Sequence, residues 1–356
     1  MGVRALTVEP RVPASAALTD VHFSNPGPGW ARVRMLATGI CGTDIEIVSG
    51  EYGAAPPGAS RLIIGHESLG VLDRVDDHGA WSVGQHVAGI VRRPDPVPCA
   101  SCAAGEWDMC RNGRYTECGI KERHGFCAEY FLCETDFLIA APPELGSLAV
   151  LIEPTSVVAK AWEHIERIGA RAFWRPRRVL VTGAGPVGLL AALLGMQRGL
   201  EVHVLDRVSS GPKPDLVRGL GATFHCTETA AELLKKVVPD VVLECTGAAE
   251  VVIDVMSANA RGAIVCLLGV SGAGRSIRLD VGALNRSIVL ENDVIFGSVN
   301  ANRRHYELAV KALRAADSSW LSALITRRVP LGRWQEALTK KPDDVKVVIV
   351  PDDAGG

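Results

Sequence analysis

The chain of 356 residues lacks several features that mark whole classes of protein. Its formal net charge is only −2, so it has no excess of basic residues for phosphate contacts, and we expect no nucleic-acid partner. The opening residues MGVRALTVEPRVPAS contain no secretory signal, and Leu6 stands where an N-myristoylation motif needs Ser or Thr. No internal repeat or low-complexity tract occurs. The length exceeds the size at which a single core stops growing, which predicts two domains.

The chain also lacks an unbroken apolar run long enough for a membrane span. Its most apolar segment, residues 179–196, is interrupted by glycines and a proline and divides better into a strand and a helix, so we expect no membrane partner. Cysteine is plentiful, with ten residues, of which five lie between 99 and 127 at spacings typical of metal ligands. Together with the missing signal, this pattern favours a reducing cytoplasm and thiols bound to metal rather than disulfides.

A soft thiolate and an imidazole occur in two short glycine-containing phrases. Cys41 lies in GICGTD, and His66 followed by Glu67 lies in GHESLG. Cysteine sulfur and histidine nitrogen suit Zn²⁺, and a site with three protein ligands and one open position lets the metal act as a Lewis acid. A lone Cys or His is more often structural, but here Gly42 and Gly65 would let the backbone come close.

Two patterns divide the chain. Residues 1 to about 150 contain short strands separated by Gly and Pro turns, such as ALTVE, ARVRMLATG, SLGVLDRV, HVAGIV and EYFLC, which predicts an irregular, β-rich, barrel-like domain. From about residue 175 apolar strands alternate with helices, which predicts a doubly wound domain with about six parallel strands. We expect residues 1–155 and 300–356 to form the first domain and residues 156–299 the second.

The second domain opens with a dinucleotide-binding signature. In RRVLVTGAGPVGLL, a strand is followed by Gly183-x-Gly185-x-x-Gly188 and then a helix, with Pro186 and Val187 in its first turn. The free N–H groups of that helix terminus would bind the pyrophosphate. The later turns at Thr246-Gly247 and Gly269-Val270 should face the same ligand.

Asp206 follows the second strand and would accept hydrogen bonds from the ribose hydroxyls of NAD, while its charge would repel the 2′-phosphate of NADP. Arg207, with Arg218 or Lys213, could neutralise that phosphate, so we expect both cofactors to be used.

The whole phrases GICGTD and GHESLG, with the glycine turn, resemble the zinc-dependent medium-chain alcohol dehydrogenases. The pattern GRYTExGIxxxHGF, in which Cys118 is a departure, and the phrase GSVNANRRH resemble their glucose 1-dehydrogenase group. The resemblance implies a catalytic zinc bound by Cys41 and His66, with Glu67 as a direct or exchangeable ligand. It also implies that Thr43 passes on the alcohol proton and that Asp44 orients the imidazole. Glu153, in LIEPTS, would close the zinc site or hold the sugar.

The same resemblance assigns further roles. Glu117 and Asn300 would bind sugar hydroxyls, and Ser298, Val299 and Asn300 would lie along the nicotinamide. Family members have a structural zinc held by four cysteines; here Cys99, Cys102 and Cys110 match the last three, but Pro96 replaces the first. Asp95, Asp108 and Cys118 are the candidates for a fourth ligand, and the alternative is a segment that has lost its metal.

We therefore predict an NAD(P)-dependent zinc enzyme that oxidises an aldose, D-glucose above all, at C1 to the lactone, and that forms a homodimer or homotetramer as the resemblance implies. The nearest alternative is the same chemistry on a polyol, an amino alcohol or a biosynthetic secondary alcohol, since Thr155 departs from the familiar phrase. A zinc-free reductase of the superfamily would lack Cys41 and His66. A non-catalytic dinucleotide-binding protein is the third alternative. Cys226, Cys245 and Cys266 are expected to be core residues.

Overall fold

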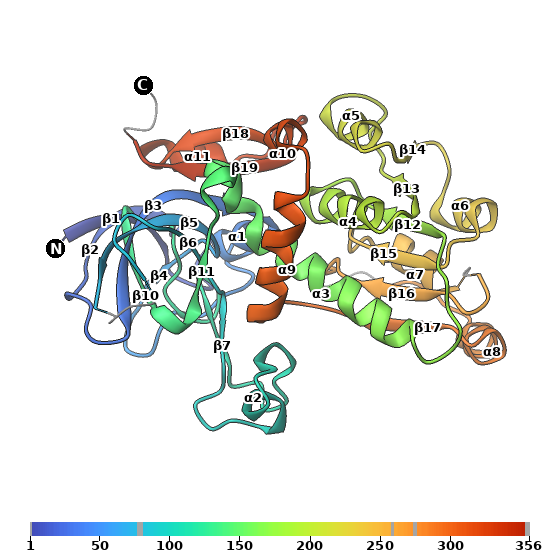
Figure 1. Ribbon diagram of the computed structural model, residues 1–356, viewed down its shortest axis with the longest axis horizontal. Helices are drawn as coiled ribbons and strands as arrows, with labels where there is room; N and C mark the ends of the chain where they lie inside the picture. The colour runs from blue at the N-terminus through green and yellow to red at the C-terminus, as the bar shows by residue number, and fades with distance from the viewer. Residues whose placement is uncertain (1, 77–80, 258–259, 273–275, 353–356) are drawn as a thin grey trace. The chain divides into compact units, whose positions relative to one another are not determined.

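A computed structural model describes residues 2–76, 81–257, 260–272 and 276–352. Its contacts divide the chain into two compact units, Met1–Ser156 with Asn300–Gly356 and Val157–Val299. Figure 1 shows the helices and strands of each unit. Within the described residues, no helix is both long enough and apolar enough to cross a bilayer.

The first unit is built on a mostly antiparallel sheet around β3 (Trp30–Ile40). Along β3, buried Ala31, Val33 and Met35 alternate with more exposed residues, as a half-buried strand requires. Antiparallel pairing places Gly39 of β3 opposite Glu67 at the start of β5, and β19 pairs with the other side of β3. In the described residues the order is β11-β6-β5-β3-β19-β18, with β10 also paired to β3; the remaining bounds are β5 Glu67–Val75, β6 His86–Gly89, β10 Tyr130–Glu134, β11 Leu138–Ala140, β18 Ile325–Pro330 and β19 Lys346–Val350.

Two small sheets and several short helices complete this unit. The strands β2, β1 and β4 form one small sheet, and β7, β8 and β9 form the other. Figure 1 shows β7 leading to a lobe around α2 that projects from the sheets of the same unit. The bounds are β1 Gly2–Val8, β2 Ala17–His22, β4 Leu62–Ile63, β7 Arg92–Arg93, β8 Thr116–Cys118, β9 Glu122–Arg123, α1 Gly42–Val48, α2 Ala100–Ala103, η1 Trp107–Met109, η2 Thr135–Phe137, η3 Pro143–Leu151, α3 Ile152–Gly169 (which continues into the second unit), α9 Arg303–Arg314, α10 Ser318–Leu324, η4 Leu331–Arg333 and α11 Trp334–Leu338.

Glycines allow three loops to meet next to His66. Gly65 has φ +85°, and a Cβ placed on Gly119 or Gly125 would lie 2.5 Å or 2.3 Å from the Gly65 carbonyl oxygen. Phe126 N–H and Gly65 C=O are hydrogen-bonded at 2.8 Å, which fixes this approach. The backbone that carries His66 is therefore held on both sides by segments that only glycine permits to come so close.

The second unit is a parallel sheet with the order β14-β13-β12-β15-β16-β17, six strands in the part of the chain that the structure describes. The strand order reverses beside β12, so the carboxyl ends of β12 and β15 diverge to leave the place where such folds bind ligands. The doubly wound, parallel fold predicted from the sequence is confirmed. Its elements are β12 Arg178–Thr182, α4 Pro186–Gln197, β13 Glu201–Leu205, α5 Pro212–Gly219, β14 Thr223–His225, α6 Ala230–Val237, β15 Val241–Glu244, α7 Ala249–Ser257, β16 Ile264–Leu267, α8 Val281–Glu291 and β17 Val294–Gly297.

Candidate active site

Asp44 connects the two loops that carry Cys41 and His66. Its carboxylate is fully buried and accepts hydrogen bonds from Cys41 N–H at 2.9 Å and from Gly65 N–H at 3.2 Å. The Cys41 thiol in turn accepts from Thr43 N–H at 3.3 Å, so Cys41 and Asp44 form a capping box at the start of α1. One carboxylate therefore fixes both phrases of the predicted metal site.

The His66 ring lies between Cys41 and Asp44. Its Nε2 is 3.1 Å from Cys41 Sγ, and its Nδ1 is 3.5 Å from Asp44 Oδ1. Burial alone would lower the pKa of His66, but the charges of Cys41 and Asp44 raise it well above its ordinary value. This is the arrangement in which a carboxylate orients an imidazole toward a metal through the other ring nitrogen.

Glu67 and Glu153 add two buried carboxylates to the same place. One ligand atom each from His66, Glu67 and Glu153 lie within 4.8 Å of one another, as do atoms from Cys41, Asp44 and His66. Glu153 is in the first turn of α3, and Glu67 opens β5. The pKa of Glu153 is raised to about 7, because burial, helped by the nearby charge of Glu67, outweighs the opposing effect of His66.

This donor set fits a zinc ion. The half-buried Cys41 thiol and the buried carboxylates of Glu67 and Glu153 lie around the His66 imidazole, and these are donor types that zinc binds. Thr43 is half-buried directly beside Cys41. Thr155 is the residue whose departure from the family phrase left the substrate prediction open. It is fully buried and its hydroxyl donates to the Leu151 carbonyl at 2.7 Å, so its side chain forms a hydrogen bond one helical turn back along the chain.

Lys346 is part of this cluster and was missed in the sequence. Its side chain is 1% exposed, pairs with the Glu67 carboxylate and donates to the Ile40 carbonyl at 3.1 Å. Burial lowers the pKa of Lys346, but Glu67 and Cys41 more than offset this, so the pKa is raised. The available signal was a lysine opening the apolar strand KVVIV, since a lysine in such a strand needs a buried partner.

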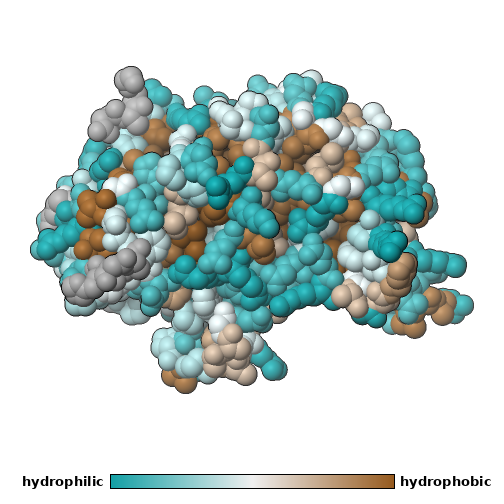
Figure 2. Space-filling model, viewed as in Figure 1, coloured by the Kyte–Doolittle hydropathy of each residue, from teal (hydrophilic) through white to brown (hydrophobic). Residues whose placement is uncertain are grey.

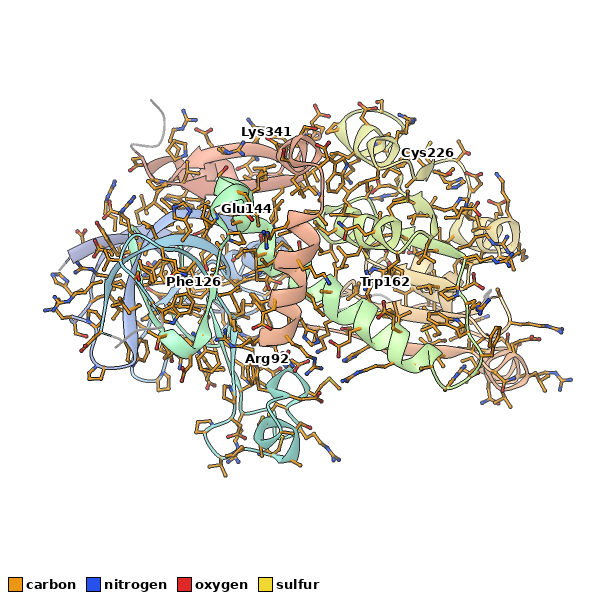
Figure 3. The ribbon with its side chains drawn as sticks, viewed as in Figure 1. Arg92, Phe126, Glu144, Trp162, Cys226 and Lys341 are labelled. Carbon is orange, nitrogen blue, oxygen red and sulfur yellow. The ribbon has the colours of Figure 1, made fainter. Side chains whose placement is uncertain are left out.

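Glu117 and Asn300 are in contact, as their shared predicted role requires. Asn300 Nδ2 donates to Glu117 Oε1 at 2.7 Å, and both side chains are buried. The same oxygen accepts from Arg92 Nε at 3.1 Å and Nη2 at 3.0 Å. The guanidinium of Arg92, which Figure 3 labels, stacks over the Tyr115 ring at 3.7 Å. Sequence reasoning missed Arg92, although an Arg-Arg pair directly after an apolar strand was visible.

The glycine turn of the second unit has the form that the motif predicts. Gly183 has φ +90°, and a Cβ on Gly188 would lie 1.8 Å from the Gly183 carbonyl oxygen, so helix α4 packs against the turn only with glycine there. Gly185 is the N-cap of α4, and Pro186 and Val187 form its first turn. The first N–H groups of α4 are consequently available to an anion.

Asp206 lies against this turn. Its Oδ2 accepts from Ala184 N–H at 2.7 Å and from Lys213 Nζ at 3.1 Å, and Oδ1 accepts from Val208 N–H at 3.2 Å. Burial would raise the pKa of Asp206, but the Ala184 N–H and Lys213 hold it below its ordinary value. Arg207 is exposed beside it. The Asp206 carboxylate and the Lys213 ammonium therefore meet beside the glycine turn, and Arg207 follows directly in the chain.

Glu244 organises the neighbouring turns and was also missed. It is fully buried at the end of β15 and accepts from Thr182 Oγ1, Thr246 N–H and Gly247 N–H, while its backbone carbonyl accepts from Gly269 N–H. Val270 and Val299 are exposed, and Lys160 Nζ donates to the Val299 carbonyl at 3.0 Å. Ser298 N–H bonds to Leu267, the last residue of β16.

Cys99, Cys102 and Cys110 meet in the projecting lobe. One sulfur from each lies within 4.8 Å of the other two, and the Cys99 and Cys102 sulfurs are 3.7 Å apart. Of the other cysteines, Cys266 is in the core as expected, whereas Cys226 and Cys245 are half-buried at strand ends, so the core expectation is wrong for these two.

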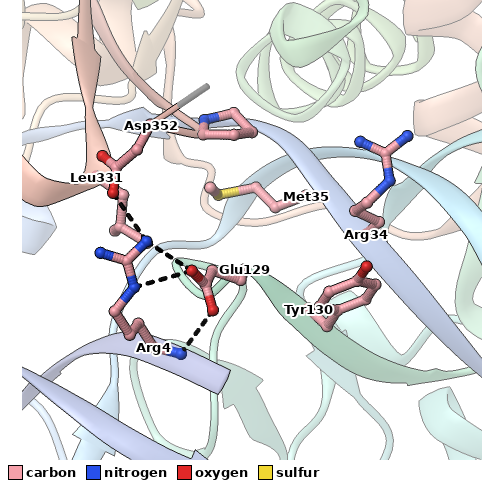
Figure 4. Close-up of a pocket in the computed structure, with 8 residues that line it drawn as sticks. Arg4, Arg34, Met35, Glu129, Tyr130, Leu331 and Asp352 are labelled. Atoms are coloured by element: carbon pink, nitrogen blue, oxygen red, sulfur yellow. Dashed lines mark hydrogen bonds and ion pairs between the residues drawn. The ribbon is translucent and has the colours of Figure 1, made fainter. Parts of the chain in front are cut away.

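A separate hollow in the first unit is lined by Arg4, Arg34, Glu129 and Tyr130, and it shares no residue with the clusters described above. In this hollow Arg4 pairs with Glu129 and Asp352 (Figure 4).

Comparison with known proteins identifies the family. Residues 27–143 match the alcohol dehydrogenase GroES-like domain, and residues 146–350 match the glucose dehydrogenase C-terminus. The chain belongs to the zinc-dependent medium-chain alcohol dehydrogenases, in their glucose dehydrogenase group. The resemblance seen in GICGTD, GHESLG and GSVNANRRH is confirmed.

Whole-length relatives agree with this family. The chain is 38% identical to a glucose 1-dehydrogenase of Methanocella arvoryzae and 40% identical to one of Vulcanisaeta moutnovskia, with 98% of this chain and 99% of each relative covered. The solved structure of Haloferax mediterranei glucose dehydrogenase in complex with NADP, Zn and gluconolactone superposes with a TM-score of 0.90 at 29% identity, covering 98% of this chain and 99% of that one.

The buried pair of Lys346 and Glu67 yields a stability prediction for this glucose dehydrogenase family member. Lys346→Met should lower the free energy of unfolding by about 3–5 kcal/mol, because it leaves a buried carboxylate without its cation. Urea denaturation followed by circular dichroism measures the loss.

Lys340→Met is the matched control, because Lys340 is exposed. It should change the free energy of unfolding by no more than about 0.5 kcal/mol. The double variant Glu67→Gln/Lys346→Met should regain part of the lost stability, and equal losses for Lys346→Met and Lys340→Met would contradict the pairing.

Proposed function

We propose that this chain catalyses the NAD(P)-dependent oxidation of an aldose, D-glucose above all, at C1 to the lactone. The observation that carries the proposal is that His66 lies close both to the Cys41 thiol and to the buried carboxylates of Glu67 and Glu153, in a chain that matches glucose 1-dehydrogenases over nearly their whole length. A relative of the same fold has been solved with NADP, Zn and gluconolactone, which are the cofactor, metal and product of this reaction.

The cluster would hold the catalytic metal through its own donors. Zn²⁺ bound by Cys41, His66 and either Glu67 or Glu153 supplies a Lewis acid that lowers the pKa of a sugar hydroxyl. Asp44 keeps the His66 ring turned toward the metal, and Lys346 limits how far the Glu67 carboxylate can move. Thr43, beside Cys41, accepts the hydroxyl proton and passes it toward solvent.

Glu117 and Asn300 would bind the sugar. The carboxylate accepts from sugar hydroxyls and the amide can donate or accept, which suits a polyhydroxylated ligand. The Arg92 guanidinium, stacked on Tyr115, supports this role because its Nε and Nη2 hydrogen bonds fix the direction of the Glu117 carboxylate. Binding the sugar in one orientation supplies much of the rate enhancement, since the reacting carbon is then placed in advance.

The NAD(P) cofactor would bind through groups of the second unit and through Asn300. The turn Gly183–Gly188 would take the pyrophosphate, Asp206 and Arg207 the adenosine ribose, and Gly269, Val270, Ser298, Val299 and Asn300 the nicotinamide side. We further propose that residues 1–155 with 300–356 act as the catalytic domain and residues 156–299 as the dinucleotide-binding domain. A cytoplasmic location would suit the ten cysteines, all of which are free thiols.

Asp206→Asn should shift cofactor preference toward NADP. The change removes a charge that repels the 2′-phosphate and releases Lys213, so the ratio of kcat/KM for NADP over NAD should rise at least about tenfold, or about 1.4 kcal/mol. Steady-state kinetics with each cofactor gives the ratio. Asp343→Asn, at an exposed acid of the first unit, is the control and should leave the ratio unchanged. An unaltered ratio for Asp206→Asn would show that Asp206 does not select the cofactor.

A substrate panel tests the function itself. Purified enzyme should turn over D-glucose with a higher kcat/KM than other aldoses, polyols, amino alcohols or simple secondary alcohols, because the buried Glu117 and Asn300 are suited to several hydroxyls at once. Chelator should abolish the activity. A higher kcat/KM for a polyol or an amino alcohol would show that this compound, and not an aldose, is the preferred substrate.

The variant Cys41→Ala tests whether Cys41 is needed for metal-dependent turnover but not for cofactor binding. Turnover should be lost while NADP affinity, measured by calorimetry, stays nearly unchanged. A comparable loss of NADP affinity would show that Cys41 lies elsewhere in the mechanism.

We also propose that the enzyme is a homo-oligomer that associates through β17 and α8. β17 is the edge strand of its sheet, and α8, which has no buried residue, exposes Val281, Val289 and Leu290. Figure 2 shows apolar side chains at its lower right, where Figure 1 places α8. Light scattering should give a molar mass of two or four times 37.8 kDa. Val289→Lys should reduce it, whereas Val83→Lys, at an exposed position of the first unit, should not; a monomeric native chain would exclude this association.

A further inference from the structure

The three-cysteine lobe, residues 94–115, holds thiols in a metal-binding arrangement. Its three sulfurs lie within 4.8 Å of one another. Arg111 N–H donates to Cys99 Sγ at 3.4 Å, an interaction that favours a thiolate. The lobe projects from the rest of its unit, and Cys99 and Cys110 are half-exposed. Thiolates at such spacings bind zinc, and a closed tetrahedral site needs a fourth donor.

None of the candidates for a fourth protein ligand is free to serve. Pro96 is exposed and has no donor atom in its side chain. The Asp95 carboxylate accepts from Asn112 Nδ2 at 2.8 Å, Arg114 Nε at 3.2 Å and Val97 N–H at 2.8 Å. Both of its oxygens are therefore engaged in holding the lobe's own backbone and side chains.

Neither Asp108 nor Cys118 places a ligand atom in the group that the three sulfurs form. Asp108 Oδ1 accepts from Asn302 Nδ2 at 2.8 Å, which ties the lobe to the start of α9. Cys118 is 2% exposed in an apolar cluster with Phe126 and Phe131, and burial raises the pKa of its thiol. Among the described residues, no further His, Cys, Asp or Glu places a ligand atom within 4.8 Å of all three sulfurs.

We propose that this lobe binds Zn²⁺ through Cys99, Cys102 and Cys110 alone, with the fourth position filled by a donor from solvent. Water occupies that position when no better ligand is present, and a free thiolate displaces it, because soft sulfur is the stronger partner for a metal that already has three sulfur ligands. The half-exposed sulfurs give solvent access to the metal. The lobe therefore differs from a closed structural site in exchanging one ligand, and its zinc is released faster. This inference is independent of the proposed function.

Cobalt spectroscopy on the full chain tests the open position. His66→Ala removes a ligand of the other metal site, so that the lobe can be observed by itself. This variant should bind one Co²⁺ per chain, with sulfur-to-cobalt absorption and the visible bands of a tetrahedral ion. Adding 2-mercaptoethanol should shift the visible bands. An absence of lobe metal, or a spectrum that the thiol leaves unchanged, would overturn the proposal.

Pro96→Cys in the same background supplies the missing sulfur. Its cobalt spectrum should resemble that of the thiol-treated parent and should not respond to 2-mercaptoethanol. Zinc transfer to a chromophoric chelator should slow by at least about tenfold, since even outer-shell changes alter metal affinity by 10–100-fold. Pro57→Cys, an exposed proline outside the lobe, controls for an added thiol and should leave the spectrum and the rate unchanged.

Cys110→Ser provides the complementary loss of a ligand. It should leave the lobe without stoichiometric cobalt in the His66→Ala background, while near-ultraviolet circular dichroism reports whether the rest of the chain keeps its fold. Full cobalt binding by a folded Cys110→Ser variant would contradict a site made of three thiolates. Asp95→Asn in the same background should keep the cobalt bands of the parent and their response to 2-mercaptoethanol. Altered cobalt bands in a variant whose near-ultraviolet circular dichroism matches the parent would identify Asp95 as a fourth protein ligand and would overturn the proposal.

Discussion

The first unit depends on keeping several buried charges balanced within an apolar β-sheet core. Asp44, His66, Glu67, Glu153 and Lys346 are all at least nine-tenths buried. Isolated charges are costly there, so each must be neutralised by a neighbour, a hydrogen bond or a cation. Lys346 neutralises Glu67, and Asp44 accepts two backbone N–H groups and faces His66. The thiol of Cys41 and the carboxylate of Glu153 complete a set of donors for a divalent metal.

The second polar network of this unit joins the three-cysteine lobe to the predicted sugar-binding residues. Arg92 donates from Nε and Nη2 to Glu117 and from Nη1 to the Asp108 carbonyl. Asp108 lies between Cys102 and Cys110, and Asn302 donates to its carboxylate. Order in the lobe is therefore transmitted by direct hydrogen bonds to the carboxylate that Asn300 also contacts.

Much of the fold could be predicted because local patterns determine it. The glycine turn is recognisable since Gly183 and Gly188 meet steric limits that no other residue satisfies, and the parallel strands are continuous apolar runs. The pairing of Arg92 with Glu117 and that of Lys346 with Glu67 could not be predicted, because their partners lie 25 and 279 positions away and charge alone does not select among many acids.

By itself, the sequence determined the nature of the chemistry. A thiol, an imidazole and carboxylates in glycine-flanked phrases, followed by a dinucleotide turn, define donors and a ligand whatever their exact arrangement. Only the tertiary structure decided how these groups are balanced. It showed that Lys346 pairs with Glu67 and that Arg92 pairs with Glu117. It also showed that Thr155 forms its hydrogen bond to Leu151, and that Asp95 and Asp108 accept hydrogen bonds from Asn112 and Asn302. The physical reason is that residue type fixes which bonds a side chain can make, whereas burial and distance between remote segments decide which of those bonds form.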